Sequence, residues 1–145
     1  MKSICAVVIG MAWLTQSVGA LAGDADQGVR RGTPKGVSES FFACTDRAGG
    51  DIVGLGNCST AEKKVQDARL NKAYSALMSK LDSQGKDHLR AAERAWIEFN
   101  ARSVDTELDV RSSEKTANID ASINEIYRYA ERANTLEGLL SVVGD

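Results

Sequence analysis

Residues that could act as general bases or nucleophiles are few in this sequence, and they do not form a recognisable catalytic set. The only histidine, His88, could accept a proton, but no partnered nucleophile accompanies it. The sequence has no nucleophile elbow, phosphate-binding loop, dinucleotide fingerprint or metal-binding helix motif. We therefore expect no catalytic residue, no metal site and no cofactor.

Paired carboxylates are candidates for one further reaction, the cleavage of a glycan. Such an enzyme needs two acids about 5–10 Å apart on either side of a cleft. Glu93 with Glu98, or Glu131 with Glu137, are the candidate pairs. These acids alternate with arginines along predicted helices, which is the pattern of a solvated, salt-bridged surface. The pattern argues against a small peptidoglycan-cleaving enzyme.

Cysteine chemistry points to a disulfide. Cys5 lies in the apolar N-terminal segment, which leaves Cys44 and Cys58 as a pair. In an oxidising compartment such a pair forms a disulfide, and closing a loop of about fifteen residues contributes roughly 3 kcal/mol. Two free thiols, or two zinc ligands, are the alternative, although zinc would need further ligands nearby.

The first 22 residues have the order of a secretory signal peptide. Lys2 is followed by an apolar run over residues 4–14 and by small residues at Ala20 and Ala22. Cleavage after Ala22 would leave no stable membrane anchor and would place the protein in the periplasm or outside the cell. An uncleaved anchor is the alternative, but polar residues at 15–17 interrupt the apolar run.

Length and charge limit what the remainder can be. The chain has 145 residues and a formal net charge of −2, which suits one domain and does not suit a nucleic-acid binder. Residues 23–40 are polar, glycine-rich and without periodicity, so they read as a flexible leader or, alternatively, as a basic docking arm. The helical domain is expected over residues 41–145.

Three amphipathic helices are predicted after a glycine-rich loop between the cysteines. The first begins at a capping box formed by Ser59 and Glu62 and ends near Gly85. The second spans about residues 86–110 and the third about residues 114–140. Apolar residues at steps of three or four form the buried stripe of each helix: Val65, Leu70, Ala73, Tyr74, Leu77 and Leu81; then Leu89, Ala92, Trp96, Phe99 and Ser103; then Ile119, Ile123, Ile126, Ala130 and Ala133.

These elements predict an all-α fold, an antiparallel bundle of three main helices with a disulfide-tethered N-terminal loop. The single tryptophan of the domain, Trp96, is expected between the other two helices, near Tyr74 and Tyr127. Glu93 and Asn100 are expected outside the buried stripe of the second helix.

Two runs of the sequence resemble the LprI-type lysozyme-inhibitor family. Its members carry a Cys, then Asp-x-x-Leu-Asn-x-x-Tyr-x-x-Leu, then Leu-x-x-Ala-x-x-x-Trp. The matching residues here are Asp67, Leu70, Asn71, Tyr74, Leu77, Leu89, Ala92 and Trp96. The resemblance covers about residues 44–140, and we interpret its motif positions as mainly packing positions.

The sequence departs from the family after the tryptophan. The family follows it with an Arg-Asp pair and a further Cys, where this chain has Asn100, Ala101, Ser103 and Val104. The last Cys of the family is also absent. Both halves of one family disulfide are thus missing together, which implies a looser junction between the second and third helices.

The resemblance implies a non-catalytic protein of the bacterial envelope that binds a protein partner, such as a lysozyme or another cell-wall hydrolase. An accessory or immunity-type partner of a secretion system is the alternative. A self-associating helical module is a third hypothesis. The sequence does not point to partner-binding residues.

Overall fold

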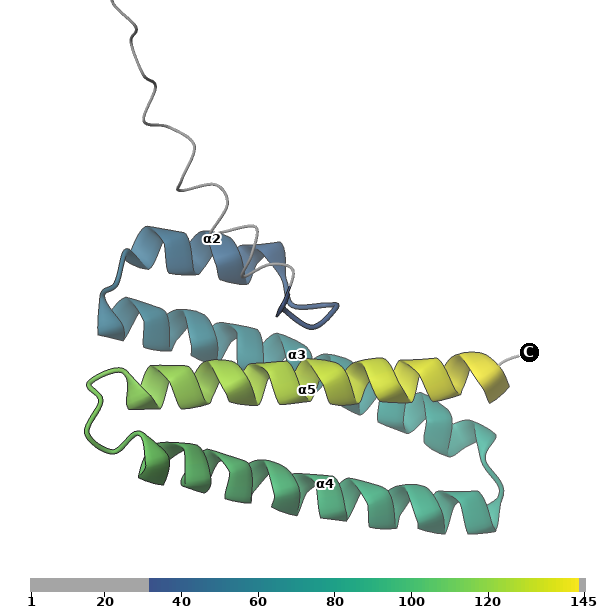
Figure 1. Ribbon diagram of the computed structural model, residues 1–145. Coiled ribbons are helices and arrows are strands. Elements are labelled where there is room, and N and C mark those ends of the chain that lie inside the picture. Colours follow the sequence, from purple (N-terminus) through teal and green to yellow (C-terminus); the bar gives the residue numbers. More distant parts are fainter. Residues whose placement is uncertain (1–31, 144–145) are drawn as a thin grey trace, which may run out of the picture. The chain divides into compact units, whose positions relative to one another are not determined.

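The computed structural model describes residues 32–143, and the expected signal peptide lies outside them. The described residues form four helices and contain no strand: α2 (Glu39–Ala48), α3 (Ile52–Lys80), α4 (Ser83–Val110) and α5 (Ala117–Val143) (Figure 1). The all-α prediction and its three long helices are confirmed. No described helix is both long and apolar enough to cross a membrane.

The predicted loop between the cysteines was wrong, because this region is helical on both sides of a two-glycine turn. Ser38 caps α2 by accepting a hydrogen bond from the Phe41 amide, and Gly49 ends it with a left-handed φ of 55°. Asp51 then caps α3 at the Gly54 amide. Good caps at both ends offset the low helix propensity of the glycines in this segment.

The expected capping box at Ser59 and Glu62 was also wrong, because α3 starts seven residues earlier, at Ile52. Both side chains lie buried within the helix. The Glu62 carboxylate instead accepts a hydrogen bond of 2.9 Å from the backbone amide of Ser38 and another from its hydroxyl. Glu62 therefore anchors the start of α2 on α3.

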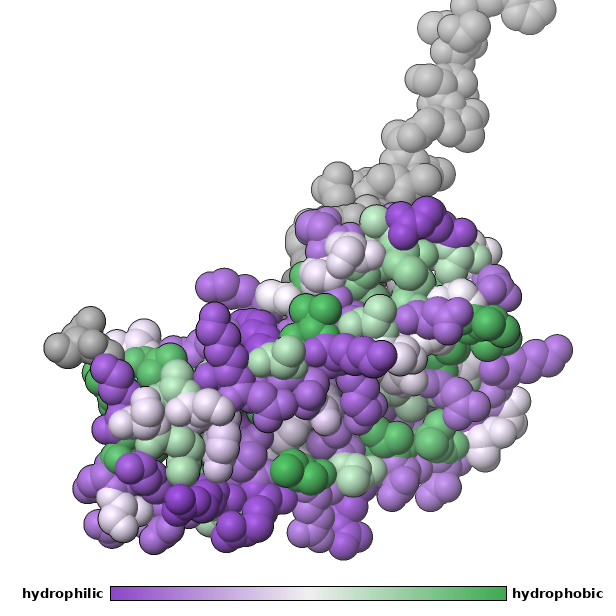
Figure 2. All heavy atoms as spheres, turned by 180° about the vertical axis from the view of Figure 1, so that it is seen from behind, coloured by the Kyte–Doolittle hydropathy of each residue, from purple (hydrophilic) through white to green (hydrophobic). Residues whose placement is uncertain are grey.

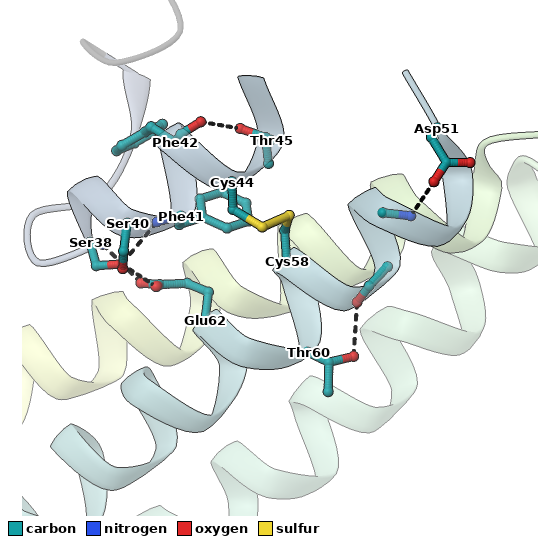
Figure 3. Close-up of a disulfide and its surroundings, with 12 residues drawn as sticks. Ser38, Ser40, Phe41, Phe42, Cys44, Thr45, Asp51, Cys58, Thr60 and Glu62 are labelled. Carbon is teal, nitrogen blue, oxygen red and sulfur yellow. Dashed lines mark hydrogen bonds between the residues drawn. A yellow bond between two sulfur atoms is a disulfide. The ribbon is translucent and has the colours of Figure 1, made fainter. Parts of the chain in front are cut away.

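The disulfide between Cys44 and Cys58 is confirmed, with their Cα atoms 5.7 Å apart. It ties the middle of α2 to the second turn of α3, beside the Ser38–Glu62 contact (Figure 3). Phe41, Phe42 and Cys58 pack here against Ile126 of α5. The bond therefore fastens a short helix onto the bundle, not a loop.

The segment just before α2 is held by side chains of α3 and α5. The Lys35 carbonyl accepts hydrogen bonds from Asn134 Nδ2 at 3.0 Å and Arg69 Nη1 at 3.3 Å. The Gly36 carbonyl accepts one of 2.7 Å from Gln66, which is fully buried. These contacts satisfy backbone carbonyls of a turn that lies outside the helices.

The main core lies between α3 and α5. Leu70, Ala73 and Leu77 of α3 meet Ala133 of α5, as the apolar stripes of these helices predicted, and also Leu136, which the predicted stripe did not include. Small residues on α5, including Ala130 at 0% exposure, let the two helices approach closely. Ile119 and Ile126 are buried as expected, whereas Val65 is 48% exposed.

Helix α4 packs on α5 through a different face from the one predicted. Ala92 is exposed and Phe99 is 58% exposed, whereas Asn100 is buried and Glu93 is mostly covered. The buried face follows Leu89, Glu93, Trp96 and Asn100, so it is shifted sideways from the apolar stripe. The α4–α5 contact is therefore largely polar.

Candidate functional site

A groove of about 360 Å³ lies between α3 and α4, and Tyr129 of α5 also lines it. It is open to solvent and combines aromatic, apolar and charged side chains. Its lining residues are Asp67, Leu70, Asn71, Tyr74, Arg90, Glu93, Arg94, Trp96, Ile97 and Tyr129. The groove exists because α3 and α4 each pack on α5 and make few contacts with each other.

Five of the eight family-motif residues line this groove: Asp67, Leu70, Asn71, Tyr74 and Trp96. Leu70, Leu77 and Leu89 are buried, as expected of packing positions. Asp67, Asn71 and Ala92 are exposed, and Tyr74 and Trp96 are half-buried. Packing therefore explains only part of the motif, and its polar members lie at the groove.

Trp96 lies against Tyr129, not against Tyr127 as predicted. The two rings meet edge to face, with centroids 5.0 Å apart and an interplanar angle of 84°. Tyr127 is on the opposite side of α5, where its hydroxyl is 3.3 Å from that of Thr33 and its ring packs near Phe41 and Phe42. Tyr74 shares the groove with Trp96, in agreement with the prediction.

Tyr129 remains a neutral hydroxyl well above neutral pH. Burial raises the pKa of this phenol, and the nearby carboxylates of Glu125, Asp67 and Glu93 raise it further. The Lys63 ammonium, 5.6 Å from the ring centroid, acts against this increase. At neutral pH the Tyr129 hydroxyl can therefore donate or accept a hydrogen bond in the groove.

Ion pairs fasten α4 to α5 beneath the groove. Arg132 donates from Nε and Nη2 to one oxygen of Glu93, at 3.0 and 2.8 Å. Arg128 donates to Asn100 at 2.8 Å and to Glu107 at 2.5 Å. The side chains of both arginines and of Glu93 are at most 16% exposed.

Most charged groups around the groove are compensated. Lys63 pairs with Glu125 and Arg90 pairs with Asp87, each at 2.8 Å. Arg132 pairs with Glu93. One acid and one base at the groove, Asp67 on α3 and Arg94 on α4, have no ion-pair partner among the described residues. The groove thus has free charges of opposite sign on opposite walls and almost no net charge.

Helix α4 also presents large apolar side chains to solvent. Ile97 is 57% exposed at the edge of the groove, and Phe99 is 58% exposed on the other flank. Phe99 lines a hollow of about 330 Å³ with Arg102, Ser103, Thr106 and Glu107. Figure 2, drawn from behind the view of Figure 1, shows such apolar residues as separate green patches on a mainly hydrophilic surface.

The candidate catalytic residues do not converge on a common site. Glu93 is bound by Arg132, and Glu98 forms an exposed pair with Arg102. Glu137 pairs with Arg69, and Glu131 is exposed. His88 borders a separate apolar hollow near the end of α5. No group of three or more histidine, cysteine or acidic residues within the described region could hold a metal ion.

A family model described as "Lysozyme inhibitor LprI" matches residues 44–137, about two thirds of the chain. The chain belongs to the LprI lysozyme-inhibitor family. The matched region contains both disulfide cysteines, the whole groove and all of α4. Comparison with curated proteins and with solved structures finds no match.

Proposed function

We propose that this protein is an exported, non-catalytic binding protein that inhibits a lysozyme-like cell-wall hydrolase. The observation that carries the proposal is the family match, which spans the disulfide, the groove and α4. The proposed location, periplasmic or extracellular, is supported by the predicted signal peptide and by the disulfide, which persists in oxidising compartments.

Helix α4 is the proposed contact surface. It packs on one side only, against α5, and only Leu89 and Asn100 are fully buried along its 28 residues. Exposed aromatic and aliphatic side chains on a rigid helix are typical anchors of protein interfaces. Phe99 and Ile97 supply such anchors on the two flanks of α4, and Glu98, Asp105 and Asp109 add exposed carboxylates that suit a basic enzyme.

The test is the rate at which lysozyme clears a cell-wall suspension in the presence of excess processed protein. We expect inhibition that saturates at about one inhibitor per enzyme. Phe99→Ala should weaken it by about 2 kcal/mol, or roughly thirtyfold, as expected for an interface anchor. Val110→Ala is the matched control, because Val110 is also exposed, at 79%, but lies at the end of α4. Lysis rates that do not change at any ratio would exclude lysozyme as the target.

The family match favours this proposal over the secretion-system partner, for which no feature of the described residues argues. Recovery of a hydrolase with the tagged protein from periplasmic extract would identify the natural target.

A further inference from the structure

The groove between α3 and α4 has a composition that the proposed protein contact does not require. Three aromatic side chains, Tyr74, Trp96 and Tyr129, come from three different helices to one cavity of about 360 Å³. Cavities that bind small molecules have volumes of about 300–1,000 Å³. The groove therefore has room for a small ligand.

Several hydrogen-bonding groups at the groove have no protein partner among the described residues. They are the Asp67 carboxylate, the Arg94 guanidinium, the indole N–H of Trp96 and the hydroxyls of Tyr74 and Tyr129. Asn71 uses only its amide nitrogen, which donates to the Asp67 carbonyl at 2.9 Å and leaves its side-chain oxygen free. The groove thus offers donors and acceptors together, on both walls.

Charge decides which ligand class fits. Because Lys63, Arg90 and Arg132 are each paired with a carboxylate, the groove has no excess charge that would select an anion or a cation. A neutral ligand with apolar C–H faces and a rim of hydroxyls suits both the aromatic side chains and the unpartnered polar groups of the groove. Its faces can pack on the aromatic rings, and each of its hydroxyls can both donate and accept a hydrogen bond.

We propose that this groove binds a neutral saccharide, with Tyr74 and Trp96 packing against a sugar ring and Asp67, Asn71 and Arg94 bonding its hydroxyl or acetamido groups. The cavity volume fits a mono- or disaccharide unit. This ligand goes beyond the proposed inhibition, since binding a sugar needs no hydrolase. A protein that binds glycan could remain on the wall polymer that its target enzyme cleaves.

The experiment is a fluorescence titration of the processed chain, in which Trp96 is the only tryptophan because Trp13 lies in the predicted signal peptide. The probes are chitotriose, which carries acetamido groups, cellotriose, which does not, and a neutral capped tripeptide. A saturable change in Trp96 emission with either sugar supports the proposal. Tighter binding of chitotriose than of cellotriose would show that the groove recognises the acetamido group. No saturable change with either sugar at millimolar concentration, or a change with the peptide alone, overturns it.

Two variants locate the binding. Asp67→Asn should weaken sugar binding about tenfold, the usual loss for one hydrogen bond to a charged group. Asp105→Asn is the matched control, because Asp105 is exposed on α4 outside the groove. Equal affinities of both variants would overturn the proposal. Lysozyme is absent from this assay, so its result does not depend on whether the protein inhibits that enzyme.

Discussion

The buried pair between Glu93 and Arg132 provides the sharpest test of how α4 is held. Glu93→Ala would leave the Arg132 guanidinium, whose side chain is 16% exposed, without the carboxylate that it pairs with in the structure. Removing one partner of a buried ion pair typically costs about 3–5 kcal/mol, a large share of the roughly 5–15 kcal/mol that stabilises a domain. We expect a loss of that size in the free energy of unfolding.

The assay is urea unfolding followed by circular dichroism, with Glu98→Ala as the matched control. Glu98 and Arg102 form an ion pair on the same helix, but their side chains are 65% and 76% exposed. An exposed pair of this kind contributes about 0.3–0.5 kcal/mol.

A third variant separates lost charge pairing from lost packing. Glu93→Leu combined with Arg132→Leu should recover most of the loss, because replacing a buried ion pair by apolar side chains is often neutral. Leu77, Leu81 and Leu89 already line a hollow with Arg132 and can cover the new side chains. If Glu93→Ala costs no more than Glu98→Ala, the pair does not hold α4, and the reasoning is refuted.

Three further predictions concern other parts of the domain. Cys44→Ser with Cys58→Ser should lower the free energy of unfolding by about 3 kcal/mol, because the bond closes a loop of 14 residues; calorimetry measures this, and an unchanged melting temperature would contradict it. Tyr129→Phe should reduce the loss of folding stability above pH 10. Because the pKa of Tyr129 is raised in the folded state, the unfolded chain loses this proton first; the contribution of Tyr129 to stability is therefore complete below pH 10.0 and falls as pH rises through the folded pKa. The free energy of unfolding, measured on both sides of pH 10, would argue against this if it fell equally steeply with pH in both proteins. Gly36→Ala should speed tryptic cleavage after Lys35, because Gly36 has a φ of 93° and an added Cβ would collide with the Arg69 guanidinium; an unchanged cleavage rate would count against this contact.

The long helices could be predicted because helix formers and turn signals agree over many residues. The start of α4 at Ser83 lies three residues before the predicted start, and its end at Val110 is as predicted. Helix α2 and the first turns of α3 were not predicted, because four glycines lie between the two cysteines. Local propensity is weak here, and the Asp51 cap, the disulfide and the packing of Phe41 on α3 decide the structure.

The buried face of α4 shows why a hydrophobic pattern alone was insufficient. The predicted stripe and the observed face share Leu89 and Trp96 and differ at the residue between these two. The prediction placed Ala92 there, whereas the structure places Glu93 there, with a side chain only 13% exposed. Both spacings fit a helix of 3.6 residues per turn. Arg128 and Arg132 on α5 decide which face of α4 is covered, because their guanidinium groups hydrogen-bond to Asn100 and Glu93. These partners are 28 and 39 positions away in the sequence, so the local pattern of α4 does not reveal them.

The groove could be predicted only in part. Its motif residues were recognised from their spacing, but their interpretation as mainly packing positions assumed that α3 and α4 meet along their length. Because both helices instead pack on α5, Asp67 and Asn71 border an open groove. The exposed Phe99 was missed as a candidate contact for the same reason, since the predicted stripe placed it in the core.

The most direct test of the proposed function is a calorimetric titration of lysozyme with the processed protein. The proposal predicts saturable heat with one protein bound per enzyme, and a markedly weaker curve for Phe99→Ala than for Val110→Ala. No heat of binding, or equal curves for these two variants, would contradict the proposed contact through α4.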